Sequence, residues 1–232
     1  MTDPAAGPVS RPDQHRITVP RTARYFTLGG ESGARTVWVV LHGYGMLAEK
    51  FVRWFAPAAG PQRLVVAPEG LNHYYTNHET RKVGATWMTS EDREVEIADY
   101  VRYLDLVLAR VLADVDPAPA VEVHGFSQGT ATAARWVALG TVRPSRLALW
   151  AGLVPPDLDL ARHGEALSRA NLTLVLGDRD EYIPEGKIEM ERTRLEGASV
   201  RFTLHRFRGG HAVPWPVLEA MASQLDPLDP PA

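Results

Sequence analysis

The sequence predicts an α/β fold with a mostly parallel central sheet and helices on both of its faces. Short apolar runs alternate along the chain with longer segments of helical periodicity. Some of these runs, such as 36–41 and 64–67, are apolar at nearly every position, as expected of strands covered on both faces. The most distinctive polar motifs directly follow such runs, and ligands in open α/β sheets bind beyond the carboxyl ends of the strands.

Composition limits the class of protein. With 232 residues, 45% hydrophobic and 23% charged, the chain suits a single globular domain, which we expect to span residues 16–225. The net charge of −3 gives no reason to expect a nucleic acid or an anionic membrane as partner. The lack of cysteine excludes disulfides, thiolate metal sites and a cysteine nucleophile. No apolar run approaches the roughly 18 residues that a membrane span needs.

The two ends of the chain differ from the domain between them. Residues 1–15 are mostly polar, with several prolines, and we expect a disordered lead-in. They lack the apolar core of a secretory signal, so a cytoplasmic protein is expected. Residues 226–232 are expected to form a frayed tail.

Strands and helices are expected to alternate after a short β-rich beginning. The longest helix, 93–114, follows from apolar residues that recur at steps of three and four, with Ser90 as a candidate N-terminal cap. The segment 70–92 is polar and aromatic and shows no clear period. The expected strands lie at 17–19, 25–28, 36–41, 64–67, 121–123, 146–150, 172–176 and 200–207. The expected helices lie at 47–56, 93–114, 130–137, within 151–170, and at 184–195 and 215–224.

The segment 121–131 carries the pattern of a nucleophile elbow, Gly125-x-Ser127-x-Gly129, between a strand and a helix. A serine on such a sharp turn sits in strained backbone geometry that projects its hydroxyl clear of the sheet. Glycines on both sides remove Cβ atoms that would collide where strand and helix cross. The turn also places the Gln128 backbone N–H at a helix N-terminus, where unpaired donors favour an anion. Ser127 is therefore a candidate nucleophile, and the alternative is an ordinary turn serine.

Three further motifs follow predicted strands. They are His42-Gly43-Tyr44, the pair Asp178 and Asp180, and His211. Because the carboxyl ends of parallel strands meet at one edge of a sheet, we expect these residues to lie near Ser127. The alternative for His211 is a loop histidine after a Gly-Gly turn.

With these motifs the chain resembles the α/β-hydrolase superfamily, and within it the small carboxylesterase-like and phospholipase-like serine hydrolases. The resemblance covers about residues 35–224 and rests on HGYG at 42–45, GFSQG at 125–129, GDRDEYIP at 177–184 and GGH at 209–211. The order nucleophile, acid, histidine is that of the superfamily. The resemblance implies the α/β-hydrolase fold, hydrolysis of a small-molecule carboxylic ester, and no cofactor.

The resemblance also implies a role for each motif residue. Ser127 would be the nucleophile, His211 the general base and Asp180 the acid that orients the histidine. The backbone N–H groups of Tyr44 and Gln128 would form the oxyanion hole. Asp178 is an additional carboxylate in this chain and the alternative acid. Its place directly after a glycine favours a turn-capping role instead, through a bond to its own backbone.

Apolar and aromatic residues near the motifs are the candidates for substrate contact. For Trp87, Met88 and Trp215, the alternative is that these side chains simply cover the core. The segment 151–170 is too short, and its first half too polar, for a long lid, so we expect a minimal lid and an open site for short or aromatic soluble esters. The candidates are Tyr44, Met46, Trp87, Met88 and Trp215.

Two other histidines, His42 and His124, are expected to be structural. His42 should hydrogen-bond the loop behind the oxyanion hole, and His124 should be a satisfied core histidine. His73, His78 and Glu79 have metal-ligating side chains, but histidines on a polar loop are usually solvated, and no metal is expected. Two alternatives to an esterase stay open. One is a thioesterase or lysophospholipase with the same triad, and the other is a catalytically silent binding module.

Overall fold

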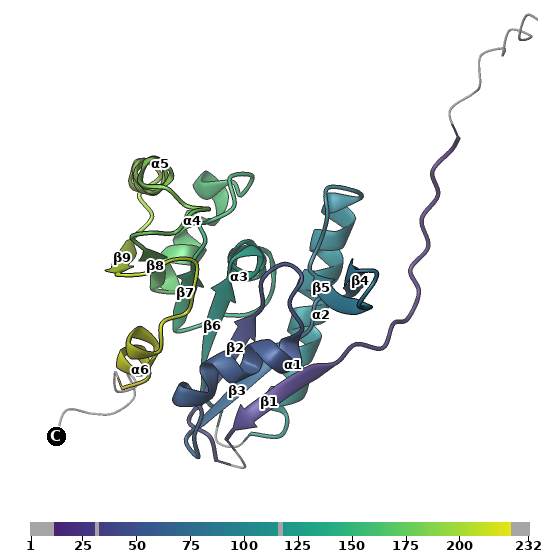
Figure 1. The fold of residues 1–232 in the computed structure, drawn as a ribbon, viewed down its shortest axis with the longest axis horizontal. Helices are drawn as coiled ribbons and strands as arrows, with labels where there is room; N and C mark the ends of the chain where they lie inside the picture. The colour runs from purple at the N-terminus through teal and green to yellow at the C-terminus, as the bar shows by residue number, and fades with distance from the viewer. Residues whose placement is uncertain (1–11, 31–32, 116–117, 224–232) are drawn as a thin grey trace, which may run out of the picture.

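The computed structural model describes residues 12–30, 33–115 and 118–223. Its centre is a seven-stranded sheet (Figure 1) in which all neighbouring strands are parallel except the antiparallel pair at one edge. The strands, in chain order, are β1 (Tyr25–Gly29), β2 (Thr36–Leu41), β3 (Arg63–Pro68), β6 (Ala120–Phe126), β7 (Arg146–Trp150), β8 (Leu172–Gly177) and β9 (Phe202–Phe207). Their order across the sheet is β1-β3-β2-β6-β7-β8-β9. The predicted mostly parallel sheet is confirmed.

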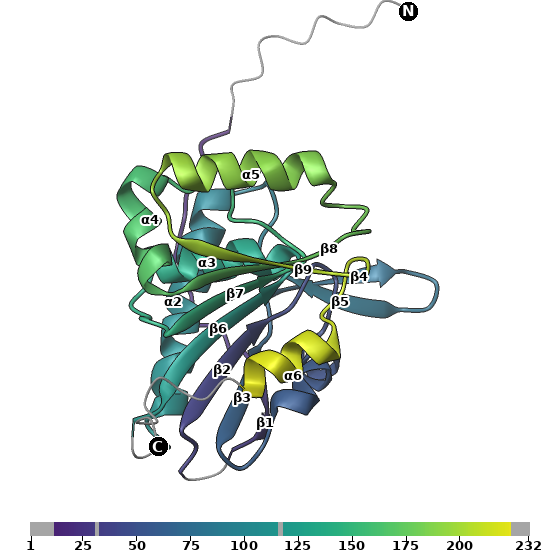
Figure 2. The same cartoon turned by 90° about the vertical axis from the view of Figure 1, so that its left-hand side faces the viewer.

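Helices cover both faces of this sheet, as predicted. The helices are α1 (Ala48–Phe51), the 3₁₀ helix η1 (Val52–Ala58), α2 (Arg93–Leu112), α3 (Gln128–Leu139), α4 (Leu160–Arg169), α5 (Glu185–Gly197) and α6 (Trp215–Ser223). Figure 2 shows α2, α3, α4 and α5 on one face, and α1 and α6 on the other. Each face has its own core of buried apolar side chains.

The alternation of side chains along β2 explains why its sequence is apolar throughout. Val37, Val39 and Leu41 belong to the core under α2 and α3, whereas Trp38 and Val40 belong to the core under α1 and α6. All five side chains are buried. Side chains of a strand point alternately to the two faces of the sheet. Because both faces are buried here, these five positions are all apolar and the sequence shows no alternation of polar and apolar residues.

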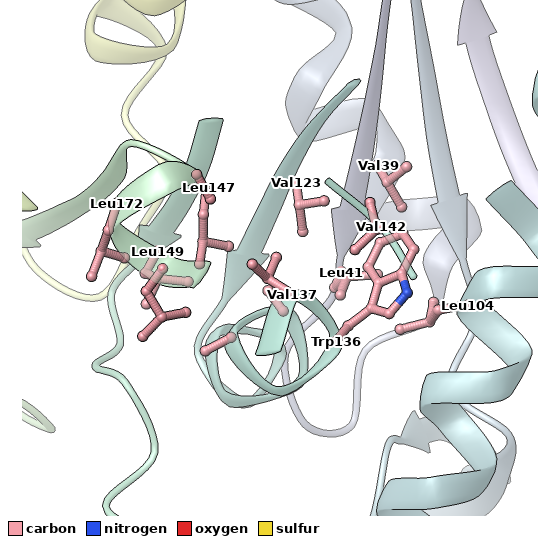
Figure 3. Packing of buried hydrophobic residues seen from close by; sticks show 14 of the residues in the cluster. Val39, Leu41, Leu104, Val123, Trp136, Val137, Val142, Leu147, Leu149 and Leu172 are labelled. Carbon is pink, nitrogen blue, oxygen red and sulfur yellow. The ribbon is translucent and has the colours of Figure 1, made fainter. Parts of the chain in front are cut away.

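Close packing on the larger core fixes α3 against the sheet. Figure 3 shows Trp136 of α3 between the strands and Leu104 of α2, with Val39 and Leu41 nearby. The Trp136 indole N–H donates to Asp105 Oδ1 at 2.7 Å, so the polar edge of this buried ring is satisfied. These contacts anchor α3, which begins directly after Ser127, against the sheet and α2.

Three parts of the chain differ from the expected elements. Residues 17–19 form no strand, because they lie away from the sheet edge, with Ile17 86% exposed. The expected helix at 47–56 is a short α turn followed by a 3₁₀ helix that contains Pro57, a residue without a backbone N–H to donate. Helix α2 is preceded by Asp92 with φ of 45° and no side-chain cap, so Ser90 is not its cap.

The segment 70–92 contains a β-hairpin that the sequence did not predict. Its strands β4 (Asn72–Asn77) and β5 (Lys82–Thr86) pair with each other and not with the main sheet. Most of the hairpin is exposed, and only the end of β5 is buried, so there is no apolar alternation to recognise. Among the described residues no helix is long and apolar enough to cross a membrane. The tail at 226–232 and most of the lead-in at 1–15 lie outside the described residues.

Candidate active site

Ser127 lies on a sharp turn between β6 and α3. Its backbone has φ of 54° and ψ of −117°, a conformation that residues other than glycine rarely adopt. A Cβ on Gly125 would lie 2.3 Å from Gly129 O, and a Cβ on Gly129 would lie 2.2 Å from Leu41 O. Strand and helix thus cross as closely as the elbow pattern predicts. The Ser127 N–H donates to Trp150 O at 3.0 Å, which ties the turn to β7.

Asp180 and His211 form a hydrogen-bonded pair at the same edge of the sheet. The Asp180 carboxylate is buried, and its Oδ2 lies 2.9 Å from His211 Nδ1. Its other oxygen accepts a hydrogen bond from the Tyr182 N–H at 2.9 Å. A carboxylate accepts this contact from an Nδ1–H, and that tautomer leaves the lone pair on Nε2.

The loops that carry Asp180 and His211 are joined by backbone and side-chain hydrogen bonds. Asp178 N–H donates to Phe207 O, and Arg179 N–H donates to Gly209 O, both at 2.9 Å. In the opposite direction, Gly209 N–H donates to Asp178 Oδ1 at 2.9 Å. The expectation that Asp178 caps its own turn is therefore wrong. Its side chain reaches across to the neighbouring loop, which packs so closely that a Cβ on Gly177 would lie 2.3 Å from Gly209 O.

The His211 ring lies beside the elbow. Its centroid is 5.0 Å from that of Phe126, the residue before Ser127, and 4.8 Å from that of Tyr182. Within the described part of the chain, Ser127 Oγ makes no hydrogen bond to His211.

The turn after β2 packs directly against the elbow. A Cβ on Gly43 would lie 3.2 Å from Ser127 Cβ. The Gly45 N–H donates to Ala85 O at 2.9 Å, and the Ala85 N–H donates to Met46 O at 3.2 Å, so two hydrogen bonds hold the turn against β5. The turn that carries Tyr44 and the helix start at Gln128, the two residues predicted to supply oxyanion donors, therefore meet beside Ser127.

His42 supports this turn from behind, as the sequence predicts. It is fully buried, its Nδ1 lies 2.8 Å from Gly43 O, and its Nε2 accepts from the Gly70 N–H at 2.9 Å. One neutral tautomer, with the proton on Nδ1, satisfies both contacts. Burial lowers the pKa of His42 to about 4, so the ring stays neutral near pH 7.

Trp87 is buried in the core. It is 1% exposed, its ring centroid is 4.9 Å from that of His42, and its indole N–H donates to His42 O at 2.8 Å. Of the two predicted alternatives, the cover of the core holds for Trp87. Met88 is half-buried and packs against the same core, and its Sδ accepts from Arg135 Nη1 at 3.6 Å.

The other residues predicted to contact substrate lie closer to solvent. Met46 is half-buried, with Sδ 3.2 Å from the position of a Cβ on Gly43. Tyr44 is 60% exposed and Trp215, at the start of α6, is 56% exposed. Tyr182, which the sequence analysis did not single out, is 61% exposed and lies against His211. Its position two residues after Asp180 could have indicated that Tyr182 lies near the site.

Two further histidines, His124 and His73, make polar contacts within the protein. His124 is fully buried, with Nδ1 accepting from Trp150 Nε1 at 3.2 Å and Nε2 3.3 Å from Glu122 Oε2. Burial lowers the pKa of His124. Its position in the core is as predicted, but its Nε2 makes no hydrogen bond among the described residues, so the prediction that this histidine is fully satisfied is wrong. His73 Nε2 lies 2.7 Å from Glu69 Oε1. Among the residues that the structure describes, no three potential ligands are grouped so that they could hold a metal.

Neither a family model nor a curated protein sequence matches this chain. Solved structures do match. Esterase PE8 has a TM-score of 0.59 and 22% identity over 88% of this chain and 97% of that one. Acyl-protein thioesterase 2 from Zea mays has a TM-score of 0.64 and 15% identity, covering 87% and 96%. The Bacillus cereus carboxylesterase has a TM-score of 0.63 and 16% identity, covering 86% and 92%. Together with the sheet order and the strained elbow, these likenesses show that the protein has the α/β-hydrolase fold.

Proposed function

We propose that the protein is a serine hydrolase that cleaves carboxylic esters with Ser127, His211 and Asp180. The observation that carries this proposal is the 2.9 Å contact between buried Asp180 and His211, at the sheet edge that also carries the strained elbow of Ser127. The similar structures include esterases and an acyl-protein thioesterase, which further supports hydrolase activity.

The first half-reaction would acylate the serine. His211 Nε2 takes the proton from Ser127 Oγ as the oxygen attacks the ester carbonyl, and the negative charge moves onto the carbonyl oxygen. Asp180 stays ionised, holds the proton on Nδ1 and stabilises the imidazolium that forms. When the tetrahedral intermediate collapses, the bond to the alcohol oxygen breaks and His211 returns its proton to the leaving alcohol.

The second half-reaction would release the acid. A water molecule gives a proton to His211 Nε2 and attacks the acyl-enzyme, and the acid leaves as Ser127 Oγ regains a proton. In both halves the oxyanion would be bound by the N–H groups of Tyr44 and Gln128. A single donor of this kind is worth about 3–4 kcal/mol in a comparable site.

The exposed residues around the site support short or aromatic soluble esters as substrates. Tyr44, Tyr182 and Trp215 each expose more than half of their surface, and the Tyr182 ring lies against His211. Exposed aromatic side chains on loops that carry site residues favour contact with apolar or aromatic ligands. Between β7 and β8 lies only the short helix α4, consistent with a minimal lid and a site open to water.

A thioester is the second candidate substrate, since the same triad supports it and one similar structure is an acyl-protein thioesterase. A lysophospholipid ester would be hydrolysed by the same chemistry. A catalytically silent binding module is the alternative of another class. It would have no need for a buried carboxylate paired with a histidine beside a strained serine, so the pair argues against it.

The experiment that tests the proposal is hydrolysis of p-nitrophenyl esters of increasing acyl length by the purified protein, with and without a fluorophosphonate. We expect hydrolysis of the short esters, loss of activity on labelling, and the label on Ser127. Ser127→Ala should abolish both, whereas the control Ser223→Ala, on the surface of α6, should behave as wild type. Label on another serine, or full activity of Ser127→Ala, would refute the proposal.

A further inference from the structure

We infer that Gln128 is also a positioning residue, whose side chain fixes the oxyanion hole to the end of β5 together with Thr86. The inference rests on the proposed function, because it assigns a role to contacts around the oxyanion donors. It concerns the side-chain amide of Gln128, which the hydrolytic mechanism does not use, and the hairpin, which the sequence left without a role.

The Gln128 amide is bound at both of its ends by the backbone of the segment after β5. Trp87 N–H donates to Gln128 Oε1 at 3.2 Å, and Gln128 Nε2 donates to Met88 O at 2.9 Å. Because these partners are a backbone donor and a backbone acceptor, they determine which way the amide points. The side chain therefore links the first residue of α3 to Trp87 and Met88, which lie about 40 residues earlier in the sequence.

Thr86 completes this bridge. Its Oγ1 accepts from Gln128 Nε2 at 2.9 Å and lies 2.9 Å from Met88 O and 3.0 Å from Gln128 Oε1, to either of which its proton can be donated. Thr86 is 2% exposed, so the loss of these contacts would leave polar groups without water to replace them. The amide, the hydroxyl and the backbone thus form one compact network.

The same segment holds the other half of the oxyanion hole. Gly45 N–H donates to Ala85 O at 2.9 Å, and Ala85 N–H donates to Met46 O at 3.2 Å, on either side of the turn that carries Tyr44. The backbones approach so closely that a Cβ on Gly84 would lie 2.4 Å from Gly45 O. Residues 84–88 consequently contact both of the chain segments that carry the proposed oxyanion donors.

This arrangement predicts an effect on the transition state and not on ground-state binding. The two donors come from distant parts of the chain, and their separation must match the oxyanion to stabilise it. A segment that binds both parts sets that separation before substrate arrives. Loosening one contact should therefore lower kcat, because a displacement of about 1 Å in a catalytic group can cost about 100-fold in rate.

Gln128→Met tests the inference because it keeps the backbone N–H and the side-chain length but removes the amide. We expect kcat for a short p-nitrophenyl ester to fall by about 10- to 100-fold with KM little changed. The affinity for an alkyl boronic acid, which forms a tetrahedral adduct on serine, should fall by the same factor as kcat/KM. Gln128→Glu should be impaired in the same way near pH 8, because a second carboxylate oxygen would face Met88 O. Its activity relative to wild type should recover as the pH falls and the carboxyl gains a proton.

Thr86 supplies an independent pair of variants in case Gln128→Met does not fold. Thr86→Val removes the hydroxyl and should lower kcat and boronic-acid affinity together, and Thr86→Ser should restore both. The matched control is Thr173→Val, which removes a strand hydroxyl bonded to Asn171 O at 3.2 Å away from these contacts, and should leave kcat unchanged.

The outcomes separate the two proposals. If the wild type hydrolyses no ester and Ser127 takes no label, the proposed function fails and this inference fails with it. If the wild type is an active esterase but Gln128→Met and Thr86→Val retain its kcat and boronic-acid affinity, the inference alone is wrong. A change confined to KM or to Tm would also overturn it, since it would show a binding or purely structural role.

Discussion

The Asp178 carboxylate accepts a hydrogen bond from the backbone N–H of Gly209, two residues before His211, at 2.9 Å. Its neighbour Asp180 contacts the His211 ring itself. The two aspartates of one loop thus make different contacts with the same partner loop. Asp178 binds the Gly209 backbone, whereas Asp180 binds the His211 imidazole. This difference can be tested by substitution.

Asp180→Asn should lower kcat by about 10⁴-fold, because an amide retains the shape but can select the wrong histidine tautomer. KM for a short ester should change little. The measurement is steady-state kinetics of the variant, with its Tm as a check that the fold is intact.

Asp178→Ala should instead lower the free energy of unfolding by about 0.5–2 kcal/mol, since it removes one loop contact, and should affect kcat far less than Asp180→Asn does. Urea unfolding and kinetics of both variants decide the assignment. If Asp178→Ala abolishes turnover while Asp180→Asn remains active, the orienting role belongs to Asp178.

Ser127→Gly should be more stable than Ser127→Ala by about 1 kcal/mol, although both should be inactive. The serine has φ of 54° and ψ of −117°, and an alanine keeps the Cβ that makes this conformation costly. Glycine removes that cost, which is partly offset by its larger conformational freedom in the unfolded chain. Urea unfolding of the two variants measures the difference, and equal stabilities would mean that the elbow stores little strain.

The pH dependence of stability should report on His42. Burial lowers its pKa from 6.5 to about 4 in the folded protein. Between these values the unfolded chain binds a proton that the folded protein does not, so the free energy of unfolding should decrease as the pH falls from 6.5 towards 4. The full contribution is present above pH 6.5, and its loss approaches about 3 kcal/mol near pH 4.

His42→Gln provides the comparison for this pH effect, because glutamine offers an acceptor but cannot take up a proton. We expect urea unfolding curves measured between pH 7 and pH 4.5 to shift less for the variant than for the wild type. Parallel pH dependence of the two proteins would show that His42 does not titrate in this way.

The sequence predicts the elements whose residues carry a local signal. The run Thr36–Leu41 is buried on both faces. The glycines on either side of Ser127 avoid collisions with backbone atoms that lie within a few residues or on the adjacent strand. The hairpin carries no such signal, because most of its residues are exposed. Only the end of β5 is buried, which is too short to show an apolar alternation. Likewise, the reach of Asp178 to Gly209 depends on two loops far apart in the sequence, so local turn preferences gave the wrong partner.

A pair of glycine substitutions tests whether the docking of the hairpin matters. A Cβ on Gly84 would lie 2.4 Å from Gly45 O and 2.7 Å from Gly45 C, both backbone atoms that cannot rotate away. Gly84→Ala should therefore push the hairpin away from the turn that carries Tyr44. Overpacking of this kind typically costs about 1–3 kcal/mol of stability. The kcat should fall as well, because the same contact holds the turn that carries Tyr44.

Gly186→Ala is the matched control, since a Cβ at this position in α5 would meet no atom within 4 Å. Alanine is preferred over glycine in a helix by up to about 1 kcal/mol, so this variant should be as stable as the wild type or more so, with unchanged kcat. The comparison requires urea unfolding and ester kinetics for both variants. If Gly84→Ala retained wild-type stability and turnover, the hairpin would have room to shift, and its contact with Gly45 would have no role in shaping the site.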